Sequence, residues 1–309
     1  MNLFDYTYKL VKQIPEGKIS SYGAVAEALG DKISARAVGR MMNQNPDADG
    51  MPCYKIVHSD GRLGGFGLGI KDKIRRLNEV NIEVKDNKIL NFDRVFFKEF
   101  KTVYPLKKLR KEQIKLSKNL SLKDGFKEIK TVAGIDVSYP KDEFENACAA
   151  CVIIDYKTKE IIEKKTISWE TNFPYISTYF FYREFPLIRE LVNILKSEPS
   201  VFMFDGNGIL HPYGIGLATQ AGIILDKASI GVAKRLLYGD IKNKEVFVDG
   251  IKKGQIFFSN EKLKHPVYIS PGHKISFDST LKIVKRLSKY KIPEPLRQAH
   301  ILAKKNLNS

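Results

Sequence analysis

The sequence predicts two domains of different class: a mainly α-helical N-terminal domain and a C-terminal α/β domain with a mixed sheet. The length of 309 residues is long for one domain and comfortable for two. The residue pattern also changes, because short helices dominate the first hundred residues and strands alternate with helices after residue 130. Residues 93–106 between them resemble a connector. We therefore expect domains at residues 1–92 and 107–309.

Short helices and one strand make up the expected N-terminal domain. Apolar residues at helical spacing predict helices over residues 3–14, 24–30, 34–42 and 71–80. Gly30 is the expected end of the second helix, and Ser34 is the expected N-cap of the third. Residues 53–57 (CYKIV) predict a short strand, which is followed by a Gly-rich turn. This order of elements is typical of a winged helix-turn-helix.

Strands and helices alternate in the expected C-terminal domain. Runs of apolar and β-branched residues predict strands over residues 131–139, 147–155 and 200–208, and a strand that continues into a loop or helix over 229–237. Helical spacing predicts helices over residues 107–126, 180–195 and 216–226, and a strand-to-helix transition over 273–290. This alternation indicates an α/β layer around a mixed sheet.

The chain is strongly basic, with 52 Lys and Arg against 35 Asp and Glu and a net charge of +17. Residues 101–130 hold ten basic and three acidic side chains, and residues 281–309 hold eight and one, whereas residues 131–280 are neutral overall. Clustered Lys and Arg bind phosphates and release counterions, so a polyanion is the expected partner. The alternative is a basic surface that serves solubility alone.

Composition excludes several classes of protein. No apolar run approaches the ~18–20 residues of a membrane span, and MNLFDYTYKL lacks the design of a signal peptide. Three cysteines cannot build a disulfide framework, so we expect a reducing, cytoplasmic environment. Cys148 and Cys151 form a CxxC pair inside a predicted strand, where they face opposite sides. We expect buried thiols there, not a metal site.

Cys53 is a candidate nucleophile. A cysteine acts in this way when a neighbour or dipole stabilises its thiolate. A lone cysteine near a strand is, however, more often a small buried hydrophobic residue. Composition alone favours the second interpretation.

Three motifs around Cys53 reverse this balance. SSYGAVAEAL, ARAVGRMMNQNP and MPCYKIVHSDGRLGGFG, in this order within residues 1–90, resemble the C-terminal domain of O6-alkylguanine-DNA alkyltransferases. The resemblance implies a winged helix-turn-helix that binds the DNA minor groove and flips the damaged base. It implies that Cys53 accepts the alkyl group irreversibly and without a cofactor. It also implies that Arg36 fills the gap in the duplex, that Tyr22 rotates the phosphate, and that Asn45 supports the turn around the site.

The sequence departs from this family beside the cysteine. Tyr54 and Lys55 stand where the family has His and Arg, so the imidazole that activates the thiol is missing. The glutamate that orients this imidazole falls on Val80, next to Glu79. The Tyr54 hydroxyl is one candidate substitute. We expect alkyl transfer, with a lesion sensor that transfers nothing as the alternative.

Three carboxylates of the C-terminal domain are candidate metal ligands. Asp136 lies on a predicted strand, Glu184 on a predicted helix and Asp205 at a strand end beside glycines. Strand-end carboxylates in α/β sheets supply the oxygen ligands that Mg²⁺ prefers. Each one alone is weak evidence, because a strand-end Asp, such as Asp155, is more often a turn or cap residue.

Six motifs favour metal ligands over turn or cap residues as the interpretation of these carboxylates. GIDVSY, NFPYISTYFFYREFP, DGNGILHPYGIGLATQAG, IGVAKRLLYG, YISPGHKIS and IPEPLRQAH resemble endonuclease V, in order, from about residue 107 onward. The resemblance implies a ribonuclease-H-like fold. It implies recognition of deaminated bases, chiefly hypoxanthine, with uracil and xanthine as further candidates. It also implies cleavage of the second phosphodiester bond on their 3′ side with Mg²⁺ or Mn²⁺.

The resemblance assigns roles to individual side chains. Asp136 and Asp205 match the metal-ligand aspartates, Glu184 matches the glutamate that completes the acidic site, and His300 matches a further ligand position. The two remaining catalytic candidates, His211 and Lys234, match residues beside the scissile phosphate, where a cation offsets developing negative charge.

Three further residues match positions that contact the damaged strand. Tyr175 matches a wedge that enters the duplex where the base is expelled. An aromatic ring suits this role, since it can stack in place of the base. Gly208 and Gly216 match glycines of the base pocket. The departures are Ser177 for a proline, Thr178 for a glycine, Tyr213 for an arginine and Gln220 for a common histidine. They leave a different or wider range of lesions open.

The leading hypothesis is a bifunctional DNA-repair protein that accepts alkyl groups at one end and cuts DNA at the other. Its expected partner is damaged double-stranded DNA, with single-stranded DNA or RNA as alternatives, and no membrane. One alternative is a sensor with an inert Cys53 that delivers the nuclease. Another is an inosine-specific ribonuclease. The sequence is compatible with a monomer and does not determine the oligomeric state.

Overall fold

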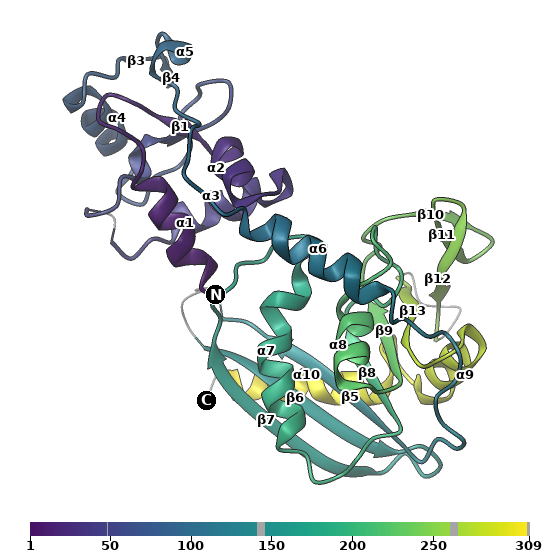
Figure 1. Ribbon diagram of the computed structural model, residues 1–309. Helices are drawn as coiled ribbons and strands as arrows, with labels where there is room; N and C mark the ends of the chain where they lie inside the picture. The colour runs from purple at the N-terminus through teal and green to yellow at the C-terminus, as the bar shows by residue number, and fades with distance from the viewer. Residues whose placement is uncertain (48, 141–145, 260–264, 308–309) are drawn as a thin grey trace. The chain divides into compact units, whose positions relative to one another are not determined.

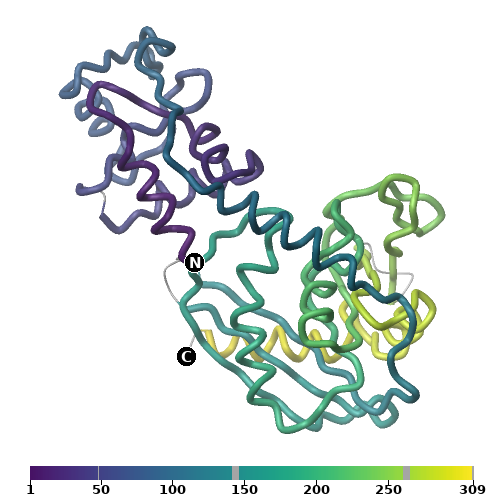
Figure 2. The backbone as a smooth tube through the Cα atoms, in the orientation of Figure 1, coloured from purple at the N-terminus to yellow at the C-terminus, as the bar shows by residue number. Residues whose placement is uncertain are grey.

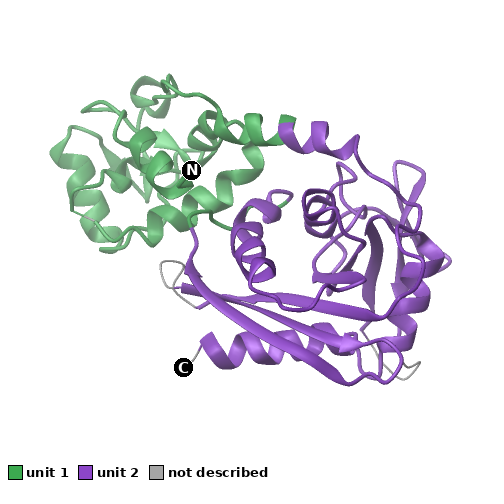
Figure 3. Ribbon diagram, turned by 60° about the horizontal axis from the view of Figure 1, so that its bottom comes forward, with its two compact units in different colours: residues 1–111, 172–177 green, residues 112–171, 178–309 purple. Residues whose placement is uncertain are grey.

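A computed structural model describes residues 1–47, 49–140, 146–259 and 265–307 of the chain. The chain divides into two compact units (Figure 3). Unit 1 comprises residues 1–111 with 172–177, and unit 2 comprises residues 112–171 with 178–309. Within the described ranges, no helix is long and apolar enough to cross a membrane.

Unit 1 is mainly helical. Its helices are α1 (Leu3–Val11), α2 (Tyr22–Leu29), α3 (Ala35–Asn43), α4 (Ile70–Glu79), α5 (Phe92–Val95) and the first part of α6 (Pro105–Ser117). Two short strands, β1 (Ser20–Ser21) and β2 (Ile56–Val57), pair in parallel, and β3 (Val84–Lys85) pairs antiparallel with β4 (Lys88–Ile89). The expected connector over residues 93–106 thus includes most of α5 and the start of α6.

Local sequence explains how two of these helices begin and end. The Ser21 hydroxyl accepts from the Ala24 N–H as the N-cap of α2. Gly30 ends this helix in the left-handed conformation, with φ of 104°, as predicted. Ser34 is the N-cap residue of α3, as predicted, but its hydroxyl makes no capping hydrogen bond to this helix. It instead donates to the Asp31 carbonyl and ends a preceding 3-10 turn.

Two predicted elements are shorter than expected. In residues 53–57, Cys53–Lys55 form a 3-10 turn, η2, and the two-residue β2 alone is strand. β2 pairs with the two residues of β1, Ser20 with Ile56 and Ser21 with Val57. The predicted helix over 107–126 ends with α6 at Ser117. After this helix, the backbone of Ser121 and Gly125 is hydrogen-bonded to Lys274. The Lys274 N–H donates to the Ser121 carbonyl, and the Lys274 carbonyl accepts from the Gly125 N–H.

In the described part of unit 2, nine strands form one mixed sheet, as predicted, in the order β10-β11-β12-β13-β9-β8-β5-β6-β7 (Figure 1). The strands are β5 (Thr131–Ser138), β6 (Asn146–Asp155), β7 (Ile161–Glu170), β8 (Val201–Asp205), β9 (Ser229–Ala233), β10 (Asp240–Lys242), β11 (Glu245–Val248), β12 (Ile251–Phe257) and β13 (Val267–His273). β5, β8 and β9 are parallel to one another, and the remaining pairs are antiparallel.

Helices cover both faces of this sheet (Figures 1 and 2). One face packs against α7 (Phe180–Asn193) and α8 (Leu217–Leu225). The other packs against α9 (Phe277–Leu287) and α10 (Glu294–Leu307). Alternate residues of a strand enter the two cores, as Val132 and Ala133 of β5 do. The predicted buried thiols are confirmed, because Cys148 and Cys151 are both buried in β6.

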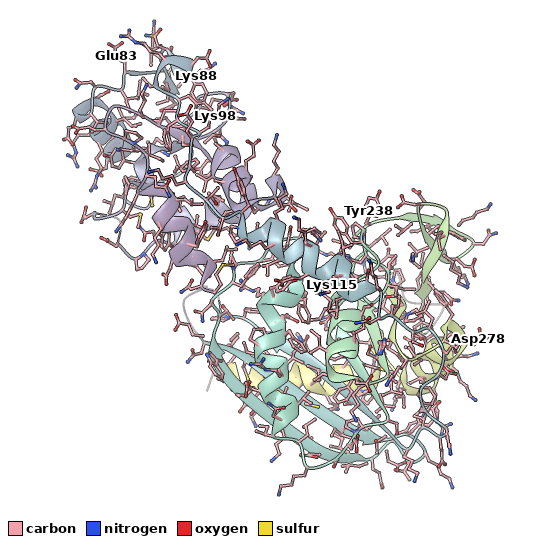
Figure 4. All side chains as sticks on the ribbon, in the orientation of Figure 1. Glu83, Lys88, Lys98, Lys115, Tyr238 and Asp278 are labelled. Atoms are coloured by element: carbon pink, nitrogen blue, oxygen red, sulfur yellow. The ribbon has the colours of Figure 1, made fainter. Side chains whose placement is uncertain are left out.

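Basic side chains on α6 remain in solvent, and Lys115 is one of them (Figure 4). This helix lies in the stretch of ten basic and three acidic residues, so its charge is available to a polyanion.

Candidate functional site

Cys53 begins the turn η2, and its side chain is only 3% exposed. The Cys53 N–H donates to the Met51 carbonyl at 2.7 Å and so closes the turn that precedes it. Asn45 Nδ2 donates to Cys53 Sγ at 3.5 Å and to the Asp47 carbonyl at 2.7 Å. Asn45 therefore links the sulfur to the loop before it.

Burial is the main influence on the Cys53 thiol and raises its pKa to about 11. The hydrogen bond from Asn45 and the charge of Lys73 act in the opposite direction, whereas the charge of Asp47 adds to the effect of burial. The thiol is therefore protonated near neutral pH. Nucleophilic chemistry at this sulfur needs a group that favours the thiolate.

The residues at the positions of the expected histidine and glutamate are used for packing. Tyr54 and Val80 both pack against an apolar cluster made of Ile19, Val57, Leu77, Ile82 and Ile89. Burial raises the pKa of the Tyr54 hydroxyl. Glu79 accepts from Arg75 Nη1 at 2.6 Å in an exposed ion pair.

Tyr22 and Arg36 lie on adjacent helices. Tyr22 begins α2, and a Cβ on Gly64 would overlap its hydroxyl, so only glycine fits beside it. Burial and then the charge of Cys53 raise the pKa of the Tyr22 hydroxyl. Arg36 is exposed on α3.

Lys73 is a residue of this site that the sequence analysis did not single out. It is fully buried on α4, and its ammonium donates to the carbonyls of Ile56, Gly64 and Gly65. The available signal is its position four residues before the buried Leu77, on the apolar face of the helix. A lysine there is unusual unless it is paired.

In unit 2, two predicted ligands meet at the ends of neighbouring strands. β5 and β8 are parallel and pair Ile135 with Phe204. The next residue on each strand is Asp136 or Asp205, so the two carboxyls lie side by side and interact. This register explains why two residues far apart in sequence form one acidic centre.

Each of the two aspartates is contacted by a nitrogen-bearing side chain. His300 of α10 is hydrogen-bonded through Nδ1 to Asp136 Oδ2 at 2.8 Å. Lys234, which follows β9, donates its ammonium to Asp205 Oδ2. Burial and the charge of Lys234 lower the pKa of His300, so its ring is neutral near pH 7. Lys234 therefore supplies counter-charge at Asp205, and His300 supplies a hydrogen bond at Asp136.

Glu184 reaches the same centre from α7. It is buried, and burial together with the charges of Asp136 and Asp205 raises its pKa well above the usual value. The Tyr139 hydroxyl donates to Glu184 Oε1 at 3.3 Å, and the Arg183 guanidinium lies 4.1 Å from the centre of the Tyr139 ring. Tyr139 is thus a further residue of this site that the sequence analysis missed.

The acidic centre fits a hard divalent cation chemically. Its donor atoms are carboxylate oxygens with an imidazole beside them. Burial, and to a smaller extent the interaction with Asp205, raises the pKa of Asp136 to about 8. Carboxyls that hold protons because of their mutual repulsion would release them to a cation. Within the described ranges, no three such side chains stand in an arrangement that holds one ion in common.

The loop after β8 carries His211 and two predicted pocket glycines. Gly216 donates its N–H to the Gly208 carbonyl at 2.9 Å, and Gly208 donates its own to Ser270 Oγ at 2.9 Å. A Cβ on either glycine would lie closer than 3.0 Å to backbone atoms, so the loop folds back only with glycine there. His211 is buried and accepts at Nδ1 from the Tyr213 N–H at 3.2 Å.

Tyr175 is 46% exposed, in the segment 172–177 that belongs to unit 1. The first residue of this segment, Asn172, accepts from the Leu3 N–H at 2.9 Å. The aromatic ring is thus presented to solvent from a segment whose backbone is fixed.

Two departures from the expected pattern have visible structural consequences. Thr178 replaces a glycine and has φ of 69°, a left-handed conformation that a β-branched residue rarely adopts. Gln220 replaces a histidine and is buried, with Nε2 donating to the Ile215 carbonyl at 3.2 Å.

Comparison with known proteins matches the two parts of the chain to two different families. The family model for Endonuclease V matches residues 114–301, and that for the 6-O-methylguanine DNA methyltransferase DNA binding domain matches residues 2–81. A protein of Picrophilus torridus named bifunctional methyltransferase/endonuclease is 42% identical over 300 residues, which are 97% of this chain and 95% of its own. The chain belongs to the bifunctional methyltransferase/endonuclease family.

Other comparisons extend this similarity. A bifunctional methyltransferase/endonuclease of Thermoplasma volcanium is 36% identical over 315 residues, which cover 100% of this chain and 91% of its own. The solved structure of Ciona intestinalis endonuclease V, in complex with a DNA containing an inosine followed by a ribo-adenosine, superimposes with a TM-score of 0.63 and 27% identity. That match covers 67% of this chain and 99% of the Ciona chain.

The acidic centre of this bifunctional methyltransferase/endonuclease should cost stability when no metal is present. Asp136 has a raised pKa, so the stability it gives is present below about pH 4 and is lost as the pH rises through about 8. In EDTA at pH 8.5, Asp136→Asn should therefore be more stable than the natural protein by at least about 1.4 kcal/mol, the equivalent of one pKa unit.

Urea unfolding followed by the fluorescence of Trp169, the single tryptophan and a residue of unit 2, measures this difference. At pH 4 the two proteins should unfold at similar urea concentrations, which serves as the control. Equal stability at both pH values would show that Asp136 is not strained by its neighbours.

Proposed function

We propose that this chain repairs DNA in two ways. Cys53 accepts an alkyl group from O6-alkylguanine in DNA, once per molecule. The acidic centre of unit 2 cuts the second phosphodiester bond 3′ to a deaminated base, chiefly hypoxanthine. In this proposal the N-terminal part is a winged helix-turn-helix and the nuclease has a ribonuclease-H-like fold. The substrate is damaged double-stranded DNA.

The nuclease activity is supported above all by the convergence of Asp136, Asp205 and Glu184 on one centre with Lys234 and His300 beside it. Asp136, Asp205 and Glu184, with His300, would hold a Mg²⁺ or Mn²⁺ ion. When bound, this ion would supply positive charge at the scissile phosphate. The Lys234 ammonium, now paired with Asp205, would offset negative charge on a phosphate oxygen. The neutral His300 fixes the orientation of Asp136.

Alkyl transfer is supported by the position of Cys53 on a rigid turn with Asn45 at its sulfur. In the transfer, the thiolate forms a bond to the alkyl carbon while the bond from this carbon to guanine O6 breaks. The bonding electrons stay on the guanine, which takes up a proton from solvent to replace the one that the thiol lost. No cofactor is needed.

A lesion sensor without transfer is the second candidate. One observation favours it: burial raises the pKa of Cys53 to about 11, and Tyr54 packs into the apolar cluster where an activating imidazole was expected. In this case the N-terminal part would bind alkylated DNA and bring the nuclease to it.

Duplex DNA with a radiolabelled O6-methyl group on guanine distinguishes transfer from sensing. Transfer predicts one label per protein molecule on the natural chain and none on Cys53→Ala. Absence of label from the natural chain, together with selective binding of the same duplex, would establish the sensor instead.

Cleavage of matched oligonucleotides that contain deoxyinosine or inosine tests the nuclease. Cutting of deoxyinosine DNA that requires Mg²⁺ or Mn²⁺ and disappears in Asp136→Ala is the expected result. A strong preference for the inosine RNA would favour the ribonuclease alternative. Cutting by Asp136→Ala at the natural rate would remove the acidic centre from the proposal.

A further inference from the structure

Lys73 is a fully buried cation whose contacts are all to the backbone. Its Nζ donates to the carbonyls of Ile56 at 2.6 Å, Gly64 at 3.2 Å and Gly65 at 3.5 Å. Three carbonyls use the three protons of an ammonium, so the group is geometrically satisfied as a cation. Its charge is a separate matter, because a buried ammonium is costly unless an anion offsets it.

Across the described residues, no carboxylate lies within ion-pair distance of Lys73. The group that can supply negative charge here is the Cys53 thiol. The helix α4, which carries Lys73, packs against the turn η2, which begins with Cys53. Ile56, the first carbonyl acceptor, is the residue that ends this turn. Burial lowers the pKa of Lys73 to about 8, and interaction with Cys53 acts against this decrease.

The other groups that interact with the sulfur are few. Asn45 donates to it, and the charge of Asp47 opposes a thiolate. The Tyr8 and Tyr22 hydroxyls also interact with it, and burial raises the pKa of each, so both remain protonated. Lys73 is therefore the cation of this set.

We propose that the Lys73 ammonium is the counter-ion of the Cys53 thiolate, and that it replaces the imidazole that the sequence lacks. This inference rests on the proposed alkyl transfer and explains how the transfer begins. When the thiol loses its proton to solvent, the pair holds a thiolate and an ammonium in a region of low dielectric. During this step the Lys73 ammonium keeps its three protons, which it donates to the carbonyls of Ile56, Gly64 and Gly65. It acts through the sulfur and is a positioning residue.

The pH dependence of Cys53 modification by iodoacetamide tests the proposal without any alkylated DNA. The modified peptide is quantified by mass spectrometry, because Cys148 and Cys151 are also free thiols. Lys73→Met should move the midpoint of reaction upward by at least one pH unit, and so slow modification at pH 7.5 at least about ten-fold. An unchanged midpoint in a folded Lys73→Met would overturn the proposal.

Lys55→Met is the matched control. Lys55 is also buried, and its Nζ donates to the carbonyls of Ile14 and Pro15 at 3.1 and 3.0 Å. Both substitutions remove a lysine that ties backbone segments together, and both should lower the melting temperature. Only Lys73→Met should move the reaction midpoint. An equal shift in both variants would assign the effect to loosening of the turn.

A reciprocal measurement keeps the test valid if Lys73→Met does not fold. In the natural protein and in Cys53→Ser, the Lys73 side chain is titrated by NMR with lysine labelled at Cε. The natural protein should hold the Lys73 proton to higher pH than Cys53→Ser, because only the former has a thiolate partner. Identical titrations would refute the pairing. A confirmed pair in a protein that takes no label from O6-methylguanine DNA would refute the proposed transfer alone.

Discussion

Replacement of Asp205 by Asn should reduce Mg²⁺-dependent cleavage of deoxyinosine DNA at least about 10³-fold. The substitution keeps the shape of the side chain but removes one of the two carboxylates that β5 and β8 bring together. It also removes the charge that holds the Lys234 ammonium in place. Single-turnover cleavage at saturating protein measures the chemical step, and a Mn²⁺ titration by EPR measures binding separately.

Asp155→Asn is the control for this experiment. Asp155 also ends a strand, but its Oδ1 accepts from the N–H groups of Lys157 and Thr158 at 2.8 and 2.7 Å and so only closes a turn. Its replacement should leave cleavage unchanged. Comparable losses in the two variants would mean that general destabilisation of the sheet, and not loss of a ligand, explains the result.

Replacement of Gly134 by Ala should destabilise unit 2 and separate His300 from Asp136. A Cβ at this position of β5 would lie closer than 3.0 Å to the backbone of Pro295 and Leu296, at the start of α10. Backbone atoms cannot yield as a flexible side chain can, so we expect a cost on the order of 2–3 kcal/mol. Urea unfolding measures the loss, and cleavage by the folded variant should fall as well.

Gly23→Ala provides the contrast. A Cβ there would meet only Ser21 Oγ at 3.7 Å, an ordinary contact, within the helix α2. Alanine in a helix is favoured over glycine by about 1 kcal/mol, so this variant should be as stable as the natural protein or more stable. A Gly134→Ala protein that keeps full stability and full cleavage would show that α10 need not lie so close to β5.

The sequence predicts the centre of the nuclease fold well because the central strands are buried runs. Residues 131–139 and 147–155 are largely apolar and form β5 and β6 nearly as expected, whereas β8 takes up only Val201–Asp205 of the predicted 200–208. Each pairs with neighbours on both sides, so burial and sequence agree. The acidic side chains at their ends were found through motifs, not through periodicity.

The outer elements were missed for a common physical reason. β7 lies at an edge of the sheet and contains charged and apolar residues without regular alternation, and β10, β11 and β12 mix polar and apolar residues over three to seven positions. α10 begins after Pro293 and contains Pro295, which hide a helix from pattern analysis although its first turn tolerates proline. Long-range pairing decides these elements.

The side-chain pairings of the sites could not be predicted from sequence. In the sequence, Lys73 does not differ from the other lysines of a basic helix. Its burial arises only when α4 packs on η2. Tyr139 follows β5 and meets Glu184 only because α7 covers that face of the sheet. Residue types predicted the chemistry, whereas tertiary packing determines which cations and hydroxyls serve it.

The hydrogen bond between Asp136 and His300 joins residues that are 164 positions apart. At 5–20 residues per second, a ribosome needs roughly 10–30 s to pass from one to the other. The Cys53 site, in contrast, draws on residues 45–73. During synthesis the turn that holds Cys53 has all its residues early, while the acidic centre stays incomplete until α10 emerges. A chain interrupted before α10 would thus lack His300, so its acidic centre would be without the group that orients Asp136.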